Sequence, residues 1–146
     1  MHNQKIIEKI NINEVRYASY KFMIEMFNSP DPHYTFDTRF KGKLESSITQ
    51  PFQEMAGQRL YPTLFDKAAI LFYLCVKNHP FEDGNKRMGL LLLLLILLKN
   101  GKWIECTNDK LFDFVIYVAK SKTKDKDQVL QYIKNFLEKY TIDYTF

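Results

Sequence analysis

Glycine, proline and cysteine are all scarce in this chain of 146 residues, which contains five Gly, five Pro and two Cys. Two cysteines, Cys75 and Cys106, imply no disulfide framework, and their spacing is not that of a metal site. No secretory signal is expected, because residues 1–5 lead into a charged, periodic segment. These absences predict a cytoplasmic protein in a reducing setting. Cys75 lies in an apolar run and is expected in the core.

A strong excess of charge of either sign is also absent. The chain has 21 Lys and Arg against 17 Asp and Glu, which gives a formal net charge of +4. A charge this small is a weak basis for binding nucleic acid, so no nucleic-acid partner is expected. The most basic segment, residues 120–126, is interpreted as a solvated loop between two helices. A content of 46% apolar and 26% charged residues is typical of a soluble globular protein.

No apolar run is long enough to predict a membrane span. The longest covers residues 88–98 and is flanked by Lys86, Arg87 and Lys99. A spanning helix needs about 20 apolar residues, whereas a run of roughly 10–14 more often indicates a buried helix. We therefore interpret the run as the central helix of a soluble core and expect no membrane partner.

No segment shows a convincing alternation of apolar and polar residues with the period of two that is typical of a β-strand. The predicted fold class is therefore all-α, in one domain spanning residues 1–146. Ile6, Ile7 and Ile10 are expected to form a short lead-in turn. Apolar residues recur at helical spacing elsewhere. The expected helices cover residues 13–27, 44–50 (ended by Pro51), 64 to 76 or 77, about 85–99 and about 125–140. Another begins at residues 107–109, with Leu111, Val115, Val118 and Ala119 on its buried side. Residues 52–61 are expected to be irregular, and residues 103–104 to form a connector.

Two of these helices are predicted to be central. Thr63 and Asp66 resemble a capping box at the start of the first, which is apolar nearly all round. The second is followed by Asn100 and Gly101, a typical helix stop. Between the two helices lies a short polar loop. Polar groups on a rigid scaffold are where function usually resides.

The loop contains residues suited to proton transfer and metal binding. His79 could act as a general base, or could be an ordinary loop histidine that caps the preceding helix. Asp83 is a hard oxygen ligand suited to Mg²⁺, or alternatively a turn or cap residue. Pro80 restricts the turn, and Phe81 is expected to face the core as a structural anchor.

The start of the second central helix is a candidate phosphate site. Gly84 permits a positive φ or the close approach of a phosphate. Asn85, Lys86 and Arg87 follow at the helix N-terminus, where free N–H groups and the helix dipole favour anions. Positively charged side chains at a helix N-terminus interact unfavourably with the helix dipole. Their presence here therefore indicates another role, and contact with phosphate oxygens would be such a role.

Taken together, residues 79–87 read His-Pro-Phe-Glu-Asp-Gly-Asn-Lys-Arg. This segment resembles the active-site motif of the Fic/Doc family, whose form is His-x-Phe-x-Asp/Glu-Gly-Asn-Gly/Lys-Arg. Seven fixed positions agree, and the resemblance extends over about residues 44–119. It implies a helical enzyme in which two central helices flank the active-site loop, with a short flap before them. It also implies ATP, or another nucleotide triphosphate, as co-substrate.

The resemblance assigns roles to these residues. His79 would deprotonate a Ser, Thr or Tyr hydroxyl of a protein target, and Asp83 would hold Mg²⁺. The phosphates would be bound by Gly84, Asn85, Lys86 and Arg87. Residues 52–61 would correspond to the flap, which holds the target segment by backbone pairing.

Two departures separate this chain from the adenylylating members. Those members usually carry Gly at the position of Lys86 and a second Arg at the position of Leu90. The Asn-Lys-Arg form resembles the Doc (death-on-curing) subgroup, toxins that bind the nucleotide in reverse and phosphorylate a translation elongation factor. A Doc-like kinase is therefore the leading hypothesis. Adenylyl transfer (AMPylation) and a non-catalytic binding module are the alternatives.

No Ser/Thr-x-x-x-Glu-Gly/Asn pattern of the family's internal inhibitory helix occurs in the chain. Restraint of the enzyme would then come from a separate antitoxin protein, or be absent.

Overall fold

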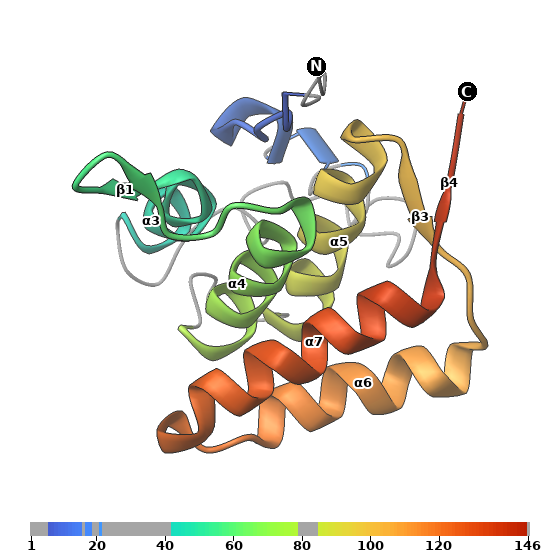
Figure 1. The fold of residues 1–146 in the computed structure, drawn as a ribbon. Coiled ribbons are helices and arrows are strands. Elements are labelled where there is room, and N and C mark those ends of the chain that lie inside the picture. Colours follow the sequence, from blue (N-terminus) through green and yellow to red (C-terminus); the bar gives the residue numbers. More distant parts are fainter. Residues whose placement is uncertain (1–5, 16, 19–20, 22–41, 79–84, 146) are drawn as a thin grey trace.

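The computed structural model describes residues 6–15, 17–18, 21, 42–78 and 85–145 (Figure 1). A helical segment at residues 12–15 precedes the named elements. These are α3 (Lys43–Thr49), η1 (Gln50–Phe52), β1 (Glu54–Met55), β2 (Gln58–Arg59), α4 (Leu64–Lys77), α5 (Asn85–Lys99), β3 (Lys102–Ile104), α6 (Asn108–Lys120), η2 (Thr123–Asp125), α7 (Lys126–Tyr140) and β4 (Thr141–Asp143). The described strands form two short antiparallel pairs, and helices form the rest of the framework, which confirms the all-α fold class.

Helices α4 and α5 lie side by side at the centre of the fold (Figure 1). Every residue of α4 from Lys67 to Val76 is buried. In α5 the buried residues are Met88, Gly89, Leu92, Leu93, Ile96 and Leu97, and the leucines between them are half-buried. The prediction of two central, buried helices with these bounds is confirmed. Among the described residues, no helix combines the length and the apolar character needed to cross a bilayer.

Local sequence signals account for the ends of these two helices. The Thr63 side chain accepts a hydrogen bond from the Asp66 N–H at 3.0 Å, and Asp66 Oδ2 accepts one from the Thr63 N–H at 3.2 Å. This is the predicted capping box. After α5, Gly101 adopts a φ of 73°, a left-handed conformation that favours glycine and ends the helix.

Helices α6 and α7 lie alongside each other and pack across α4 (Figure 1). Their contact is centred on Phe114, whose ring stacks on Phe72 of α4 at 5.0 Å and on Phe136 of α7 at 4.0 Å between centroids. Val115 and Val118 are buried as predicted. Leu111 and Ala119 are only half-buried, and the sequence analysis did not identify Phe114.

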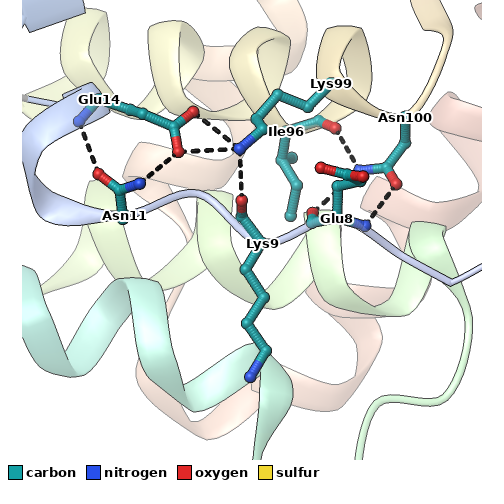
Figure 2. Close-up of polar contacts among 7 residues, drawn as sticks. All are labelled: Glu8, Lys9, Asn11, Glu14, Ile96, Lys99 and Asn100. Carbon is teal, nitrogen blue, oxygen red and sulfur yellow. Dashed lines mark hydrogen bonds and ion pairs between the residues drawn. The ribbon is translucent and has the colours of Figure 1, made fainter.

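The N-terminal segment packs against the end of α5 (Figure 2). The Glu8 backbone N–H donates to Asn100 Oδ1 at 2.8 Å, and Asn100 Nδ2 donates to the Glu8 carbonyl at 3.1 Å. Lys99 Nζ donates to the Lys9 carbonyl at 2.7 Å and pairs with Glu14 Oε2 at 2.8 Å. The side-chain amide of Asn100 therefore satisfies both the N–H and the carbonyl of Glu8, as the backbone of a neighbouring strand would.

The predicted lead-in turn at Ile6, Ile7 and Ile10 is wrong. Residues 6–11 are not helical, Ile6 is 87% exposed and Ile10 is buried. The helix starts at residue 12, where Asn11 Oδ1 accepts from the Glu14 N–H at 2.9 Å. Of the predicted helix 13–27, residues 13–15, 17, 18 and 21 are described, and they are helical.

The expectation of irregular structure at residues 52–61 and 103–104 is also corrected. β1 pairs with β2, with Ala56 (φ 52°) and Gly57 (φ 78°) forming the turn between them. β3 pairs with β4 at the far end of the chain. These strands have two or three residues each, too few for a period of two to be visible in the sequence. Pro51 does not end a helix either: α3 ends at Thr49, and Pro51 lies in η1.

Candidate functional site

The polar loop lies between the end of α4 at Lys77 and the start of α5 at Asn85. Asn78 is the C-cap of α4, and its N–H donates to the Leu74 carbonyl at 2.8 Å. The predicted residues His79, Phe81, Asp83 and Gly84 lie outside the described residues. The described part of the candidate site consists of the two helix ends that border the loop.

The two helix ends are brought together by a glycine. A Cβ on Gly89 of α5 would lie 2.8 Å from Val76 Cγ2 and 3.5 Å from ring atoms of Phe72, both on α4. Any larger side chain at this position would push the helices apart close to the loop. This role of Gly89 was not predicted from the sequence, although an isolated glycine within an apolar helical run is a signal that can indicate a close helix contact.

Two lysines donate to backbone carbonyls near the last turn of α4. Lys43 Nζ donates to the Asn78 carbonyl at 3.0 Å. Lys77 Nζ donates to the carbonyls of Ala119, at 3.4 Å, and Ser121, at the end of α6. A cation near a helix C-terminus also interacts favourably with the helix dipole. The residue that immediately precedes the loop is thus held by α3.

The first turn of α5 presents positive charge. Lys86 and Arg87 are exposed and Asn85 is half-buried, and the turn contains no acidic residue. Of the predicted phosphate-binding residues, these three lie together at the helix N-terminus, where backbone N–H groups favour an anion.

A cavity of about 370 Å³ opens beside this turn, between α5 and α6. Lys86 and Arg87 line it together with Leu90, so the residue one turn further along α5 faces the same space. The α6 side is mainly apolar and consists of Asn108, Leu111, Phe112, Val115 and Ile116. The cavity therefore combines two cations on the α5 side with an otherwise largely apolar wall.

The β1–β2 hairpin lies within residues 52–61, the segment that the family resemblance implies is the flap. Glu54 pairs with Arg59 and Met55 with Gln58, and the Leu60 N–H adds a bond of 3.2 Å to the Gln53 carbonyl. All residues from 53 to 60 are exposed. A short strand edge open to solvent can accept an extended peptide by backbone pairing.

A model of the Fic/DOC family matches residues 9–97, which include the hairpin, α4, the loop and nearly all of α5. The chain belongs to the Fic/DOC family. It is also similar to Toxin Doc of Mycolicibacterium smegmatis, with 37% identity over 60 residues. That match covers 41% of this chain and 46% of the relative, so it spans about half the length of the curated protein.

Among the described residues, no group of three or more His, Cys, Asp or Glu side chains could hold a metal ion. Asp83, the predicted Mg²⁺ ligand, lies outside those residues. Cys75 is fully buried in α4, and burial raises the pKa of its thiol well above the ordinary value. It is therefore a core residue, as predicted.

Proposed function

We propose that this Fic/DOC protein is a Doc-like kinase that transfers the γ-phosphate of ATP, or of another nucleotide triphosphate, to a Ser, Thr or Tyr hydroxyl of a protein target. Membership of the family and the similarity to Toxin Doc support the proposal. In the proposed complex the phosphates lie at the N-terminus of α5 against Gly84, Asn85, Lys86 and Arg87, with Phe81 anchoring the loop.

The proposed step is an in-line displacement. The target hydroxyl oxygen forms a bond to the γ-phosphorus while its proton passes to His79. The bond between the γ-phosphorus and the oxygen that bridges to the β-phosphate breaks, and the nucleoside diphosphate leaves with that electron pair. Mg²⁺ held by Asp83 would neutralise charge on the phosphate oxygens. Most of the catalysis would come from positioning and from stabilisation of charge.

The observation that carries the choice of kinase is the position of Leu90. Leu90 lines the same cavity as Lys86 and Arg87, one turn along α5. Adenylylating members place a second arginine there, which holds the γ-phosphate away from the base. An aliphatic side chain offers no donor for that purpose. Lys86 adds bulk and charge where those members have glycine, which favours a reversed nucleotide with its γ-phosphate beside His79.

The biological role is proposed on the same basis. A Doc-like kinase would act as a toxin, with a translation factor as a candidate target and a separate antitoxin protein as its inhibitor. The similarity to a protein named Toxin Doc supports this part of the proposal.

Labelled nucleotides test the reaction directly. The protein is incubated with cell lysate and either α-labelled or γ-labelled ATP, and intact mass spectrometry is applied to the modified target. Because the γ-phosphoryl group is the one placed beside His79, we expect γ-label only and a mass gain of about 80 Da. An α-label with a gain of about 329 Da would establish adenylyl transfer instead. If neither label is transferred although this protein is intact and folded, a non-catalytic binding module would be favoured.

A further inference from the structure

Lys67 is an unusual residue in the core of α4. Its exposed fraction is 2%, although lysine is almost never fully buried unless it is paired. Its ammonium group donates to the Pro51 carbonyl at 3.1 Å and to the Tyr61 carbonyl. The ammonium also lies 4.9 Å from the centroid of the Phe52 ring, a cation–π distance. Burial lowers the pKa of Lys67, and the nearby charge of Arg59 lowers it further.

The two carbonyls lie at opposite ends of one segment. Pro51 precedes the β1–β2 hairpin and Tyr61 follows it, so a single ammonium group joins the chain where it enters and where it leaves the hairpin. Both bonds attach the hairpin to α4, the helix that leads into the catalytic loop.

Among the described residues, the four strand residues of the hairpin contribute little themselves to holding it in place. Its strands contain two residues each, and all four residues are exposed. The ion pair across it, between Arg59 and Glu54, is 4.0 Å long and solvent-exposed, and such pairs contribute little stability. An isolated two-stranded hairpin is at best marginally stable in water. The position of this hairpin therefore depends on what holds its two ends.

We propose that Lys67 is a positioning residue, which fastens both ends of the β1–β2 hairpin to α4 and so presents a preordered strand edge to the protein target. The consequence for transfer rests on the function proposed above. A strand edge that is already ordered loses less conformational entropy when a target segment pairs with it, so the main effect falls on target affinity. Because its side chain is buried, Lys67 would act through the hairpin and not by direct contact with a substrate.

Hydrogen exchange tests the fastening without any enzymatic activity. In the wild-type protein, the Leu60 N–H, which bonds to the Gln53 carbonyl at 3.2 Å, is expected to exchange much more slowly than in a free peptide. Lys67→Met keeps the aliphatic stem but leaves two carbonyls without their donor. It should accelerate exchange in the hairpin by about tenfold or more, with little change in α7.

Lys77→Met is a matched control. Lys77 also lies on α4 and also donates to two backbone carbonyls, but those belong to Ala119 and Ser121. It should leave hairpin exchange unchanged. Lys67→Arg, which retains charge and donors, should preserve protection of the hairpin. Equal acceleration by the two methionine variants would overturn the proposal. Free-peptide exchange at Leu60 in the wild type would overturn it as well, even if Lys67→Met does not fold.

The functional readout is labelling of lysate protein with γ-labelled ATP over a dilution series of lysate. For Lys67→Met we expect the half-saturating lysate concentration to rise about tenfold, with the plateau rate and the Kd for ATP unchanged. A lower plateau at an unchanged half-saturating concentration would contradict a positioning role. If the wild-type protein transfers no label to lysate protein, the proposed kinase function is wrong. The fastening of the hairpin by Lys67 is then still tested by hydrogen exchange.

Discussion

Gly89 of α5 lies against Val76 of α4, so closely that a Cβ on the glycine would come within 2.8 Å of Val76 Cγ2. Val76 is the penultimate residue of α4 and Gly89 lies just beyond the first turn of α5. The contact therefore determines how closely the two helix ends that border residues 79–84 approach each other. A pair of apolar residues outside the motif thus contributes to the geometry of the site.

Gly89→Ala is expected to destabilise the protein. Alanine favours a helix over glycine by roughly 0.5–1 kcal/mol, but overpacking of a close helix contact costs about 1–3 kcal/mol. Because Val76 is β-branched and stiff, we expect a net loss in the free energy of unfolding, measured by urea denaturation. In a Val76→Ala background, where the close contact is relieved, Gly89→Ala should reduce the free energy of unfolding by less than it does in the wild type. A Gly89→Ala protein as stable as the wild type would show that the helices can separate freely.

Lys86→Ala is expected to weaken nucleotide binding. Removing an exposed cation from the N-terminus of α5 should raise the Kd for ATP about tenfold, and less at high salt, because charge-assisted contacts to phosphate are lost. Isothermal titration calorimetry measures this. Lys124→Ala is the control, since Lys124 is an exposed lysine in η2. Equal Kd values for the two variants would contradict the assignment of Lys86.

His79→Ala tests the general base. If His79 accepts the proton of the target hydroxyl, the transfer rate should fall by about 10²–10⁴-fold. Thermal unfolding should remain close to that of the wild type. Full transfer activity in a folded His79→Ala protein would remove His79 from the mechanism.

Asp83→Ala tests the metal site. We expect ATP affinity in the wild type to depend on Mg²⁺ and transfer to stop in the presence of a chelator, because a carboxylate oxygen is the predicted ligand. In the variant the difference in Kd with and without Mg²⁺ should largely disappear. A variant that still transfers phosphate in chelator would exclude this role for Asp83.

Asp66 should make stability depend on pH. Burial alone would raise its pKa, but hydrogen bonds from Lys134 and Thr63 outweigh this and lower the pKa of the carboxyl below its usual value. Because the folded pKa is lowered, the contribution is present at neutral pH and is lost as the pH falls below about 4. Asp66→Asn should therefore be less stable than the wild type at pH 7, by roughly 1 kcal/mol, and the difference in stability should narrow as the pH falls below about 4. A difference in stability that does not change with pH would disprove the charge dependence.

Much of the helical framework could be read from neighbouring residues. The bounds of α5, Asn85–Lys99, agree with those predicted from an apolar run closed by Asn100 and Gly101. The start of α4 follows from Thr63 and Asp66, whose capping bonds span three residues. The candidate chemistry was also visible, because residues 79–87 are consecutive. Periodicity, caps and a contiguous motif are local properties, and the sequence by itself determined them.

Tertiary structure alone decided the contacts between distant segments. Glu8 bonds to Asn100 across 92 positions, and this contact, not a local period, sets the course of the N-terminal segment. Lys67 reads as one charged residue in a helix, yet it is buried because the carbonyls of Pro51 and Tyr61 surround its ammonium group. From the sequence, Gly89 is a residue that weakens a helix, and only its contact with Val76 in the structure explains why a glycine is needed there. Each of these contacts depends on which surfaces of the folded chain come together when apolar area is buried. A local sequence pattern does not show which surfaces those are.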